Sequence, residues 1–162
     1  MGITENDLIG LRFLSPKDIS HIIDQAFPMR DVLDRNVRQL PTLRGKTILN
    51  LFFEPSTRTR VSFEMAIRTM GATSLSIDVA NSSLKKGESL YDMIKNLEAM
   101  GIDAIVIRHA NGGAPKFVSD ITNVPVINAG DGYHEHPTQG LLDIFTMIQQ
   151  RDTVKGKKVL IL

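Results

Sequence analysis

The feature that most constrains the fold is the change from a strand pattern to a helix pattern within residues 47–71. The apolar run 47–53 is typical of a buried strand. We expect this strand to end at Glu54, because the residue before a proline is forced into extended geometry. Ser56 then suits a helix N-cap, and apolar residues recur at helical spacing until Gly71 ends the helix. The segment therefore predicts a strand, a tight turn and a helix.

The start of this predicted helix carries the sequence STRTR, which places two arginines at an unusual position. The free N–H groups and the dipole at a helix N-terminus favour anions, so cations there are misplaced unless a negative group joins them. Arg58 and Arg60 therefore predict a phosphate-like dianion on the helix N-terminus, held by arginine hydrogen bonds. The alternative is a structural N-cap with two solvated arginines.

Strand-like and helix-like segments alternate along the whole chain. The pair Ser15-Pro16 starts a first helix, in which Pro28 is a candidate kink or break. We expect strands at 47–53, 73–79, 103–107 and 125–128, and helices at 16–35, 57–70, 90–100, 114–121 and from 137 onward. This alternation predicts an α/β fold with an open parallel (doubly wound) sheet of about four strands and helices on both faces.

The length of 162 residues suits one domain, and we expect residues 1–150 to form it. The segment 159–162, VLIL, has the pattern of a further buried strand at the point where the sequence stops. We therefore expect residues 151–162 to begin a second domain that is otherwise absent.

The composition excludes several classes of site and partner. A formal net charge of +1 gives no general case for nucleic-acid binding, so any basic patch has to be local. Without cysteine there is no disulfide, no cysteine nucleophile and no thiolate zinc site. No apolar run approaches the roughly 18 residues that a membrane span needs, and the N-terminus does not resemble a signal peptide. We expect a cytoplasmic protein that does not bind a membrane.

Basic residues follow all four predicted strands. Ligands collect at the carboxyl ends of parallel strands, where helix N-termini also point. The four basic clusters are residues 56–60, Lys85 with Lys86, Arg108 with His109, and His134 with His136. Their common position predicts one anion-binding edge of the sheet.

The segment HPTQ at 136–139 places an imidazole and an amide one helical turn apart. Both could hydrogen-bond a small planar group that carries a carbonyl and an amine. The alternatives are a capping role for His136, or a divalent metal held by His134 and His136 with Asp131 or Glu135. Nucleophilic catalysis by Ser56 with His136 is disfavoured, because no Gly-x-Ser-x-Gly elbow is present.

Together these motifs resemble the N-terminal, carbamoyl-phosphate-binding half of the carbamoyltransferases. STRTR at 56–60, SFE at 62–64 and HPTQ at 136–139 are similar to patterns shared by the aspartate and ornithine enzymes. SSLKKGES at 82–89, RH at 108–109 and NAGDG at 128–132 resemble the aspartate enzymes and differ from the ornithine ones. The resemblance covers nearly the whole chain, with its segments in the family order.

The resemblance implies a role for each matching residue. The phosphate would be held by Ser56, Thr57, Arg58 and Thr59, with Arg58 stabilising the departing phosphate. Arg108 and His136 would bind the carbamoyl oxygen, and Gln139 the carbamoyl amide. Lys86 would reach the active site of an adjacent subunit together with Ser82 or Ser83. No metal or other cofactor is implied.

The implied reaction is carbamoyl transfer from carbamoyl phosphate to L-aspartate, giving N-carbamoyl-L-aspartate and phosphate in pyrimidine biosynthesis. A homotrimer with shared active sites is implied, and a regulatory chain or partner enzyme is a further candidate partner. The chain lacks the region expected to bind aspartate, so we expect it to be inactive alone. The alternatives are a non-catalytic phosphate-binding or assembly module, and an ornithine carbamoyltransferase.

Overall fold

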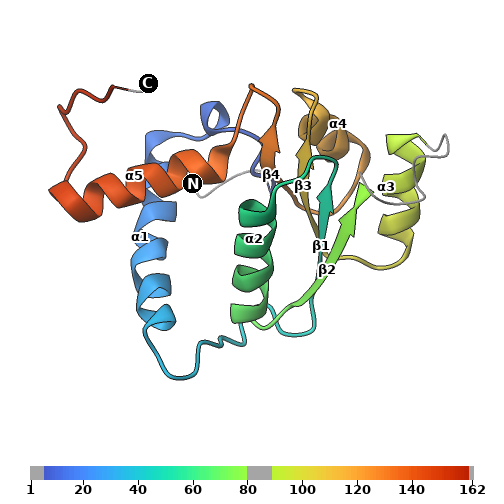
Figure 1. Cartoon of the computed structure of the whole chain (residues 1–162), viewed down its shortest axis with the longest axis horizontal. Coiled ribbons are helices and arrows are strands. Elements are labelled where there is room, and N and C mark those ends of the chain that lie inside the picture. The colour runs from blue at the N-terminus through green and yellow to red at the C-terminus, as the bar shows by residue number, and fades with distance from the viewer. Residues whose placement is uncertain (1–5, 80–88, 161–162) are drawn as a thin grey trace.

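The computed structural model describes residues 6–79 and 89–160 and confirms the predicted α/β fold. In chain order its elements are η1 (Leu11–Phe13), α1 (Pro16–Leu33), β1 (Thr47–Phe52), α2 (Thr57–Thr69), β2 (Thr73–Asp78), α3 (Leu90–Ala99), β3 (Ala104–His109), α4 (Ala114–Ile121), β4 (Val126–Asp131) and α5 (Pro137–Arg151). Along the chain, each strand is followed by a helix, as Figure 1 shows.

The four strands form one parallel sheet in the order β2-β1-β3-β4. The chain moves from β1 outward to β2 and then returns to place β3 on the other side of β1. This reversal creates a switch point between β1 and β3, where open α/β sheets bind ligands beyond the carboxyl ends of their strands. On the far side of β4, Leu8 adds an isolated parallel bridge to Ile127.

The two faces of the sheet are covered by different helices, because side chains alternate along each strand. On β1, Leu49 and Leu51 lie in a core that includes Ile94 of α3 and Val118 of α4. The alternate residues Ile48 and Phe52 lie in a second core that includes Ile67 of α2. Figure 1 shows α2 to the left of β1 and β2, and α3 to their right. The prediction of helices on both faces is confirmed.

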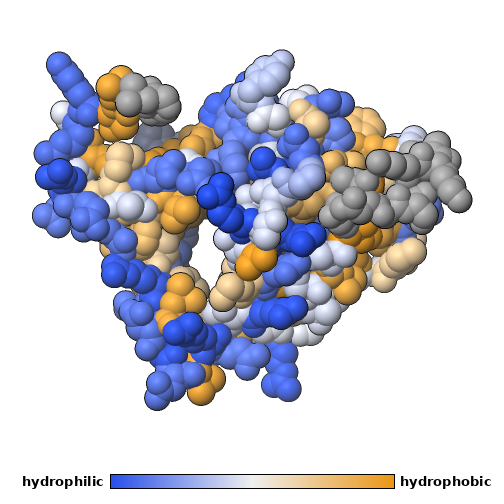
Figure 2. Space-filling model, in the orientation of Figure 1, coloured by the Kyte–Doolittle hydropathy of each residue, from blue (hydrophilic) through white to orange (hydrophobic). Residues whose placement is uncertain are grey.

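Helix α1 packs on α5, where the rings of Phe27 and Phe145 lie 4.9 Å apart. Its N-terminus is fixed by a capping box between Ser15 and Asp18, and the helix continues through Pro28. The space-filling view has an open gap between α1 and α2, and hydrophobic side chains border this gap (Figure 2).

Several element boundaries differ from the sequence predictions. Helix α1 ends at Leu33 instead of residue 35, and Pro28 does not break it. Strand β1 ends at Phe52, before the predicted Glu54. Strands β3 and β4 run to His109 and Asp131, two and three residues beyond their predicted ends at 107 and 128. The β3 extension consists of Arg108 and His109, and the β4 extension ends in Gly130 and Asp131, so a search for continuous apolar runs stops short of both strand ends.

The predicted strand at 159–162 does not form over its two described residues. Val159 and Leu160 are outside regular secondary structure and are 58% and 81% exposed. A strand needs a neighbour to satisfy its backbone groups, and no strand of the described sheet pairs with these residues.

Within the described residues, no helix is long and apolar enough to cross a membrane.

Candidate functional site

A cavity of about 770 Å³, called the main cavity below, opens where α2 and α5 begin, beyond the carboxyl ends of β1, β3 and β4. Six of the eight predicted site residues line it: Ser56, Arg58, Thr59, Arg108, His136 and Gln139. Thr57, the first residue of α2, is exposed and is not among the lining residues. Lys86 lies outside the described residues, as do Ser82, Ser83 and Lys85.

The N-terminus of α2 has no side-chain cap. Ser56 occupies the predicted N-cap position, but its hydroxyl donates to Thr59 Oγ1 at 2.9 Å and accepts no helix N–H. The first turn contains no acidic residue either. The positive end of this helix therefore faces the cavity without a side-chain acceptor, which is the arrangement that favours a bound anion.

The two arginines of this turn differ in position. Arg58 lines the cavity, is exposed, and has no ion-pair partner among the described residues. Arg60 lies 3.9 Å from Glu64, one helical turn on, and does not line the cavity. Only Arg58 is therefore placed to add a charge-assisted hydrogen bond to an anion at the helix end.

Arg108 reaches the cavity from the end of β3, where it lies next to Phe52 of β1 in the sheet register. Its Nη1 donates to the carbonyl oxygen of Ala129 at 2.9 Å. Its Nε lies 3.7 Å from Glu54 Oε2, too far for a hydrogen bond, and has no other acceptor among the described residues. The guanidinium is thus fixed at one end and retains a free donor.

His136 is the N-cap residue of α5 and, like Ser56, makes no side-chain cap bond to the helix. Its Nδ1 lies 3.4 Å from Thr138 Oγ1. Burial lowers the pKa of His136, and the positive charge of Arg108 lowers it further. The imidazole is therefore neutral at pH 7 and offers one N–H donor and one acceptor.

Gln139 lies one turn into α5, and its Nε2 donates to Asp143 Oδ1 at 2.9 Å.

Gly130 lies between Arg108 and His136. A Cβ atom at Gly130 would be 2.5 Å from Arg108 Nη1 and 3.3 Å from His136 Cδ2. The absence of a side chain at Gly130 is what allows these two cavity residues to approach each other.

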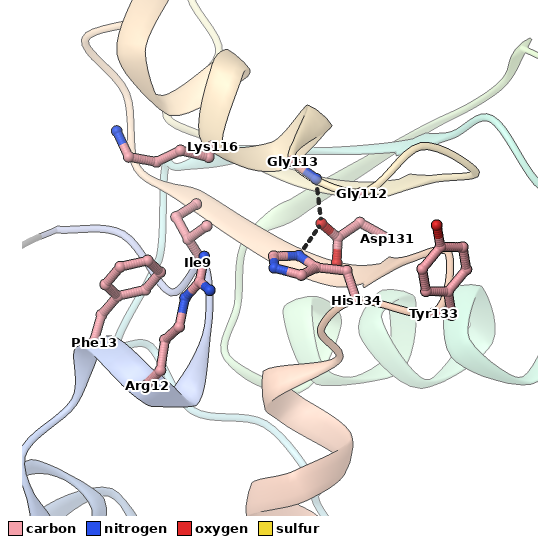
Figure 3. A pocket seen from close by; sticks show the side chains of 9 residues that line it. All are labelled: Ile9, Arg12, Phe13, Gly112, Gly113, Lys116, Asp131, Tyr133 and His134. Carbon is pink, nitrogen blue, oxygen red and sulfur yellow. Dashed lines mark hydrogen bonds and ion pairs between the residues drawn. The ribbon is translucent and has the colours of Figure 1, made fainter.

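The other two histidines of the predicted basic edge point elsewhere. The ring of His109 packs against Phe53, with 4.6 Å between centroids, and its Nδ1 accepts the N–H of Asn111. His134 lies beside a second cavity of about 440 Å³, where its Nδ1 is 3.0 Å from Asp131 Oδ2 (Figure 3). The convergence of basic residues predicted from the sequence is thus only partial.

The alternative metal site is not assembled in the structure. His134 and His136 line different cavities, with Asp131 beside His134 only. Among residues 6–79 and 89–160, no three histidine or acidic side chains lie close enough together to hold a metal ion.

Sequence reasoning did not identify every residue that shapes the cavity. It assigned no role to Glu54, which faces Arg108, or to Gly130, and it used NAGDG only as a family pattern. A glycine next to a polar residue at a strand end is a signal for close approach of side chains, and it could have singled out Gly130.

Comparison with known proteins extends these observations. Residues 6–149 match the family model described as aspartate/ornithine carbamoyltransferase, carbamoyl-P binding domain. The aspartate carbamoyltransferase catalytic subunit of Carboxydothermus hydrogenoformans is 53% identical over 160 residues, 99% of this chain and 51% of that protein. The corresponding subunit of Opitutus terrae is 52% identical over 98% of this chain and 51% of its own length. The chain thus spans about half the length of the curated relatives it matches.

Solved structures agree with the sequence comparison. The catalytic subunit of M. jannaschii aspartate transcarbamoylase superposes with a TM-score of 0.87 and 39% identity, over 94% of this chain and 49% of that one. The Trypanosoma cruzi aspartate transcarbamoylase, in complex with carbamoyl phosphate and aspartate, gives 0.85 and 35% identity over 93% of this chain and 49% of that one.

Proposed function

The chain belongs to the aspartate/ornithine carbamoyltransferase family through its carbamoyl-phosphate-binding domain, and from this membership we propose that its main cavity binds carbamoyl phosphate. The observation that carries the proposal is the uncapped N-terminus of α2, which shares one cavity with Arg58, Arg108 and His136. A dianion with a planar, polar head suits this arrangement, because it uses the helix end and the more distant donors at once.

In this proposal the phosphate group lies on the first turn of α2. The open N–H groups of the turn, with the hydroxyls of Ser56 and Thr59, donate to its oxygens. Arg58 adds a charge-assisted hydrogen bond and stabilises the negative charge on phosphate as it leaves. Thr57 contributes through its backbone N–H, since its side chain does not line the cavity.

The carbamoyl group lies toward Arg108, His136 and Gln139. An amine attacks the carbamoyl carbon, and the C–N bond forms as negative charge grows on the carbonyl oxygen. Arg108 and the N–H of neutral His136 donate to that oxygen, and Gln139 turns from Asp143 to hold the carbamoyl amide. The C–O bond to phosphate then breaks, the phosphate leaves with the electron pair, and the proton lost by the amine passes to the departing phosphate.

The acceptor amine is proposed to be L-aspartate, with N-carbamoyl-L-aspartate and phosphate as products of pyrimidine biosynthesis. The support is the name shared by the relatives that match nearly the whole of this chain. We further propose a homotrimer in the cytoplasm, in which Lys86 of one subunit completes the site of the next. A regulatory chain or partner enzyme is a further proposed partner.

Binding to the isolated chain tests the proposal directly. Titration calorimetry with phosphonoacetamide, a stable analogue of carbamoyl phosphate, is expected to show saturable binding. Arg58→Ala should weaken binding about tenfold or more, because a charge-assisted hydrogen bond to the phosphonate is lost. Arg68→Ala, at the opposite end of α2, makes the same charge change away from the cavity and should leave the affinity unchanged.

Absence of binding to a chain whose circular dichroism shows it folded would contradict a preformed phosphate site. Transfer is measured separately, as product formed from carbamoyl phosphate with L-aspartate or with L-ornithine. We expect little or no turnover by this chain alone. Preference for L-ornithine in the complete protein would overturn the proposed acceptor.

A further inference from the structure

Asn128 and Asp131, near the carboxyl end of β4, are two of the three polar residues that are fully buried in the described part of the chain. Their exposed fractions are 0% and 1%. Neither lines the main cavity, yet both lie in the segment that leads from β4 to His136. Burying an amide and a carboxylate is costly unless every polar atom is paired, so their partners indicate what they do.

The carboxylate of Asp131 accepts four hydrogen bonds, two on each oxygen. Oδ2 receives the N–H of Gly113 at 2.7 Å and Nδ1 of His134 at 3.0 Å, which Figure 3 shows on either side of the carboxylate. Oδ1 receives Nδ2 of Asn128 at 3.0 Å and the N–H of Glu135 at 2.9 Å. A carboxylate only accepts, so His134 carries its proton on Nδ1.

Asn128 extends the network to three backbone groups. Its Nδ2 also donates to the carbonyl oxygens of Ile9 at 2.9 Å and Glu135 at 3.4 Å. Its Oδ1 accepts the N–H of Gly130 at 2.8 Å. The pair therefore fixes the backbone at two points, Gly130 and Glu135, which flank the β4–α5 turn.

These two points support the two residues proposed to hold the carbamoyl oxygen. Glu135 is held through both its N–H and its C=O, and that C=O belongs to the peptide group that leads into His136. Gly130 is the surface against which Arg108 Nη1 lies, and Ala129 supplies the carbonyl oxygen that Nη1 binds.

We propose that Asp131, acting with Asn128, is a positioning residue that sets His136 and Arg108 in the geometry needed to bind the carbamoyl group. This inference rests on the proposed function of the main cavity. The carboxylate is required because all four of its partners are donors, whereas an asparagine would place its NH₂ group against two of them.

The ionisation state of Asp131 is consistent with this role. Burial acts to raise the pKa of Asp131, but the hydrogen bonds from Gly113, His134, Asn128 and Glu135 outweigh it. The net pKa lies below the ordinary value, so the group remains a carboxylate at neutral pH.

The test compares Asp131→Asn with Asp7→Asn. Asp131 contacts the end of β4 and, through Gly113, the start of α4. Asp7 contacts the same two elements elsewhere, because it accepts the N–H of Val126 at the start of β4 and the hydroxyl of Ser119 near the end of α4, both at 2.6 Å. Both variants are expected to lower thermal stability. Only Asp131→Asn should weaken phosphonoacetamide binding in calorimetry, by about tenfold, because Asp131 holds Glu135, the residue before His136, whereas Asp7 has no contact with that turn.

A second measurement follows the four histidines by ¹H–¹³C NMR during a pH titration, with His136→Gln used to assign the His136 signal. In Asp131→Asn the pKa of His136 should rise toward its ordinary value, because the released turn exposes the ring. In Asp7→Asn the His136 signal should follow that of the parent chain. If the asparagine variant does not fold, Asp131→Glu keeps the charge and displaces the oxygens, and the same two changes are expected.

The possible results separate the two proposals. If the parent chain fails to bind phosphonoacetamide, the proposed binding function fails, and the NMR titration still decides the positioning role. An unchanged His136 titration in a folded Asp131 variant overturns the positioning role. So does an affinity loss in Asp7→Asn equal to that in Asp131→Asn, since the effect would then be general destabilisation.

Discussion

At Gly130 the backbone makes room for two cavity residues. Its φ of +115° lies in a region that residues with a side chain rarely adopt, and an added Cβ would meet Arg108 Nη1 at 2.5 Å. Any residue with a side chain at this position would therefore suffer both backbone strain and a steric clash with Arg108.

The variant Gly130→Ala should lose both stability and ligand affinity. We expect a loss of roughly 1–3 kcal/mol in the free energy of unfolding, measured by urea denaturation. Phosphonoacetamide binding should also weaken, because Arg108 must move. Gly101→Ala is a matched control, since Gly101 has φ +84° and open space around the added Cβ. It should lower stability while leaving the affinity unchanged, and equal affinity in both variants would contradict a role for Gly130 in the cavity.

Individual histidines show where sequence reasoning stops at this scale. His109, His134 and His136 all lie at or beyond the ends of strands that finish at the same edge, so their sequence positions do not distinguish them. In the structure His109 packs against Phe53, His134 pairs with Asp131, and of the three only His136 lines the main cavity. The direction of each side chain depends on local φ and ψ angles and on its partners, which a strand pattern does not contain.

At the scale of elements, Ser15 and Ser56 both occupy N-cap positions but differ in their hydrogen bonds. Ser15 accepts the N–H of Asp18 at 3.2 Å, and Asp18 accepts the N–H of Ser15 at 3.0 Å, so α1 has a complete capping box. Ser56 forms no such bond at the start of α2. The sequence predicted both positions correctly, but it could not reveal that only the first serine caps its helix.

Replacement of each serine by alanine should separate structural from ligand-binding roles. Ser15→Ala is expected to lower the free energy of unfolding by about 1 kcal/mol, a typical value for a lost cap. Ser56→Ala should change it by less than about 0.5 kcal/mol, since no cap bond is lost, but should weaken phosphonoacetamide binding. Urea denaturation and calorimetry on both variants provide the measurements. The reverse order of stability losses would show that Ser56 caps α2 in solution.

At the scale of the whole molecule, the alternation of strands and helices was sufficient to predict the fold class. Continuous apolar runs such as 104–107 require cover on both faces, and a parallel sheet with helices on each face supplies it. The strand order and the supporting network of Asn128 and Asp131 were not predictable. They depend on contacts between segments far apart in sequence, such as the bond from Asn128 Nδ2 to Ile9.

The same burial that shapes the site makes the whole fold sensitive to acid. Burial lowers the pKa of both His109 and His136, with Arg108 adding to the effect at His136 and nearby carboxylates opposing it at His109. In the unfolded chain a histidine has a pKa of about 6.5. As the pH falls through 6.5 toward the folded-state values, the unfolded state binds protons first, so stability is present above this range and is lost within it.

A second stage of acid destabilisation should follow at lower pH. Asp103 has a lowered pKa because it accepts hydrogen bonds from Lys46 and Thr47, and Asp131 has one because its hydrogen bonds outweigh its burial. Stability supplied by these carboxylates is present above their unfolded-state pKa of about 4 and is lost as the pH falls toward their folded-state values.

Urea denaturation at a series of pH values can resolve the two stages, because their ranges are separated. Between pH 7 and 5 each depressed histidine can contribute a slope of at most about 1.4 kcal/mol per pH unit. His136→Asn should reduce the slope in this range and leave the second stage, below pH 4, unchanged, since it removes one histidine and none of the carboxylates. A parent chain whose stability is constant from pH 7 to 5 would show that neither imidazole is shielded from solvent in the folded state. The neutral N–H assigned to His136 in the cavity would then lose its physical basis.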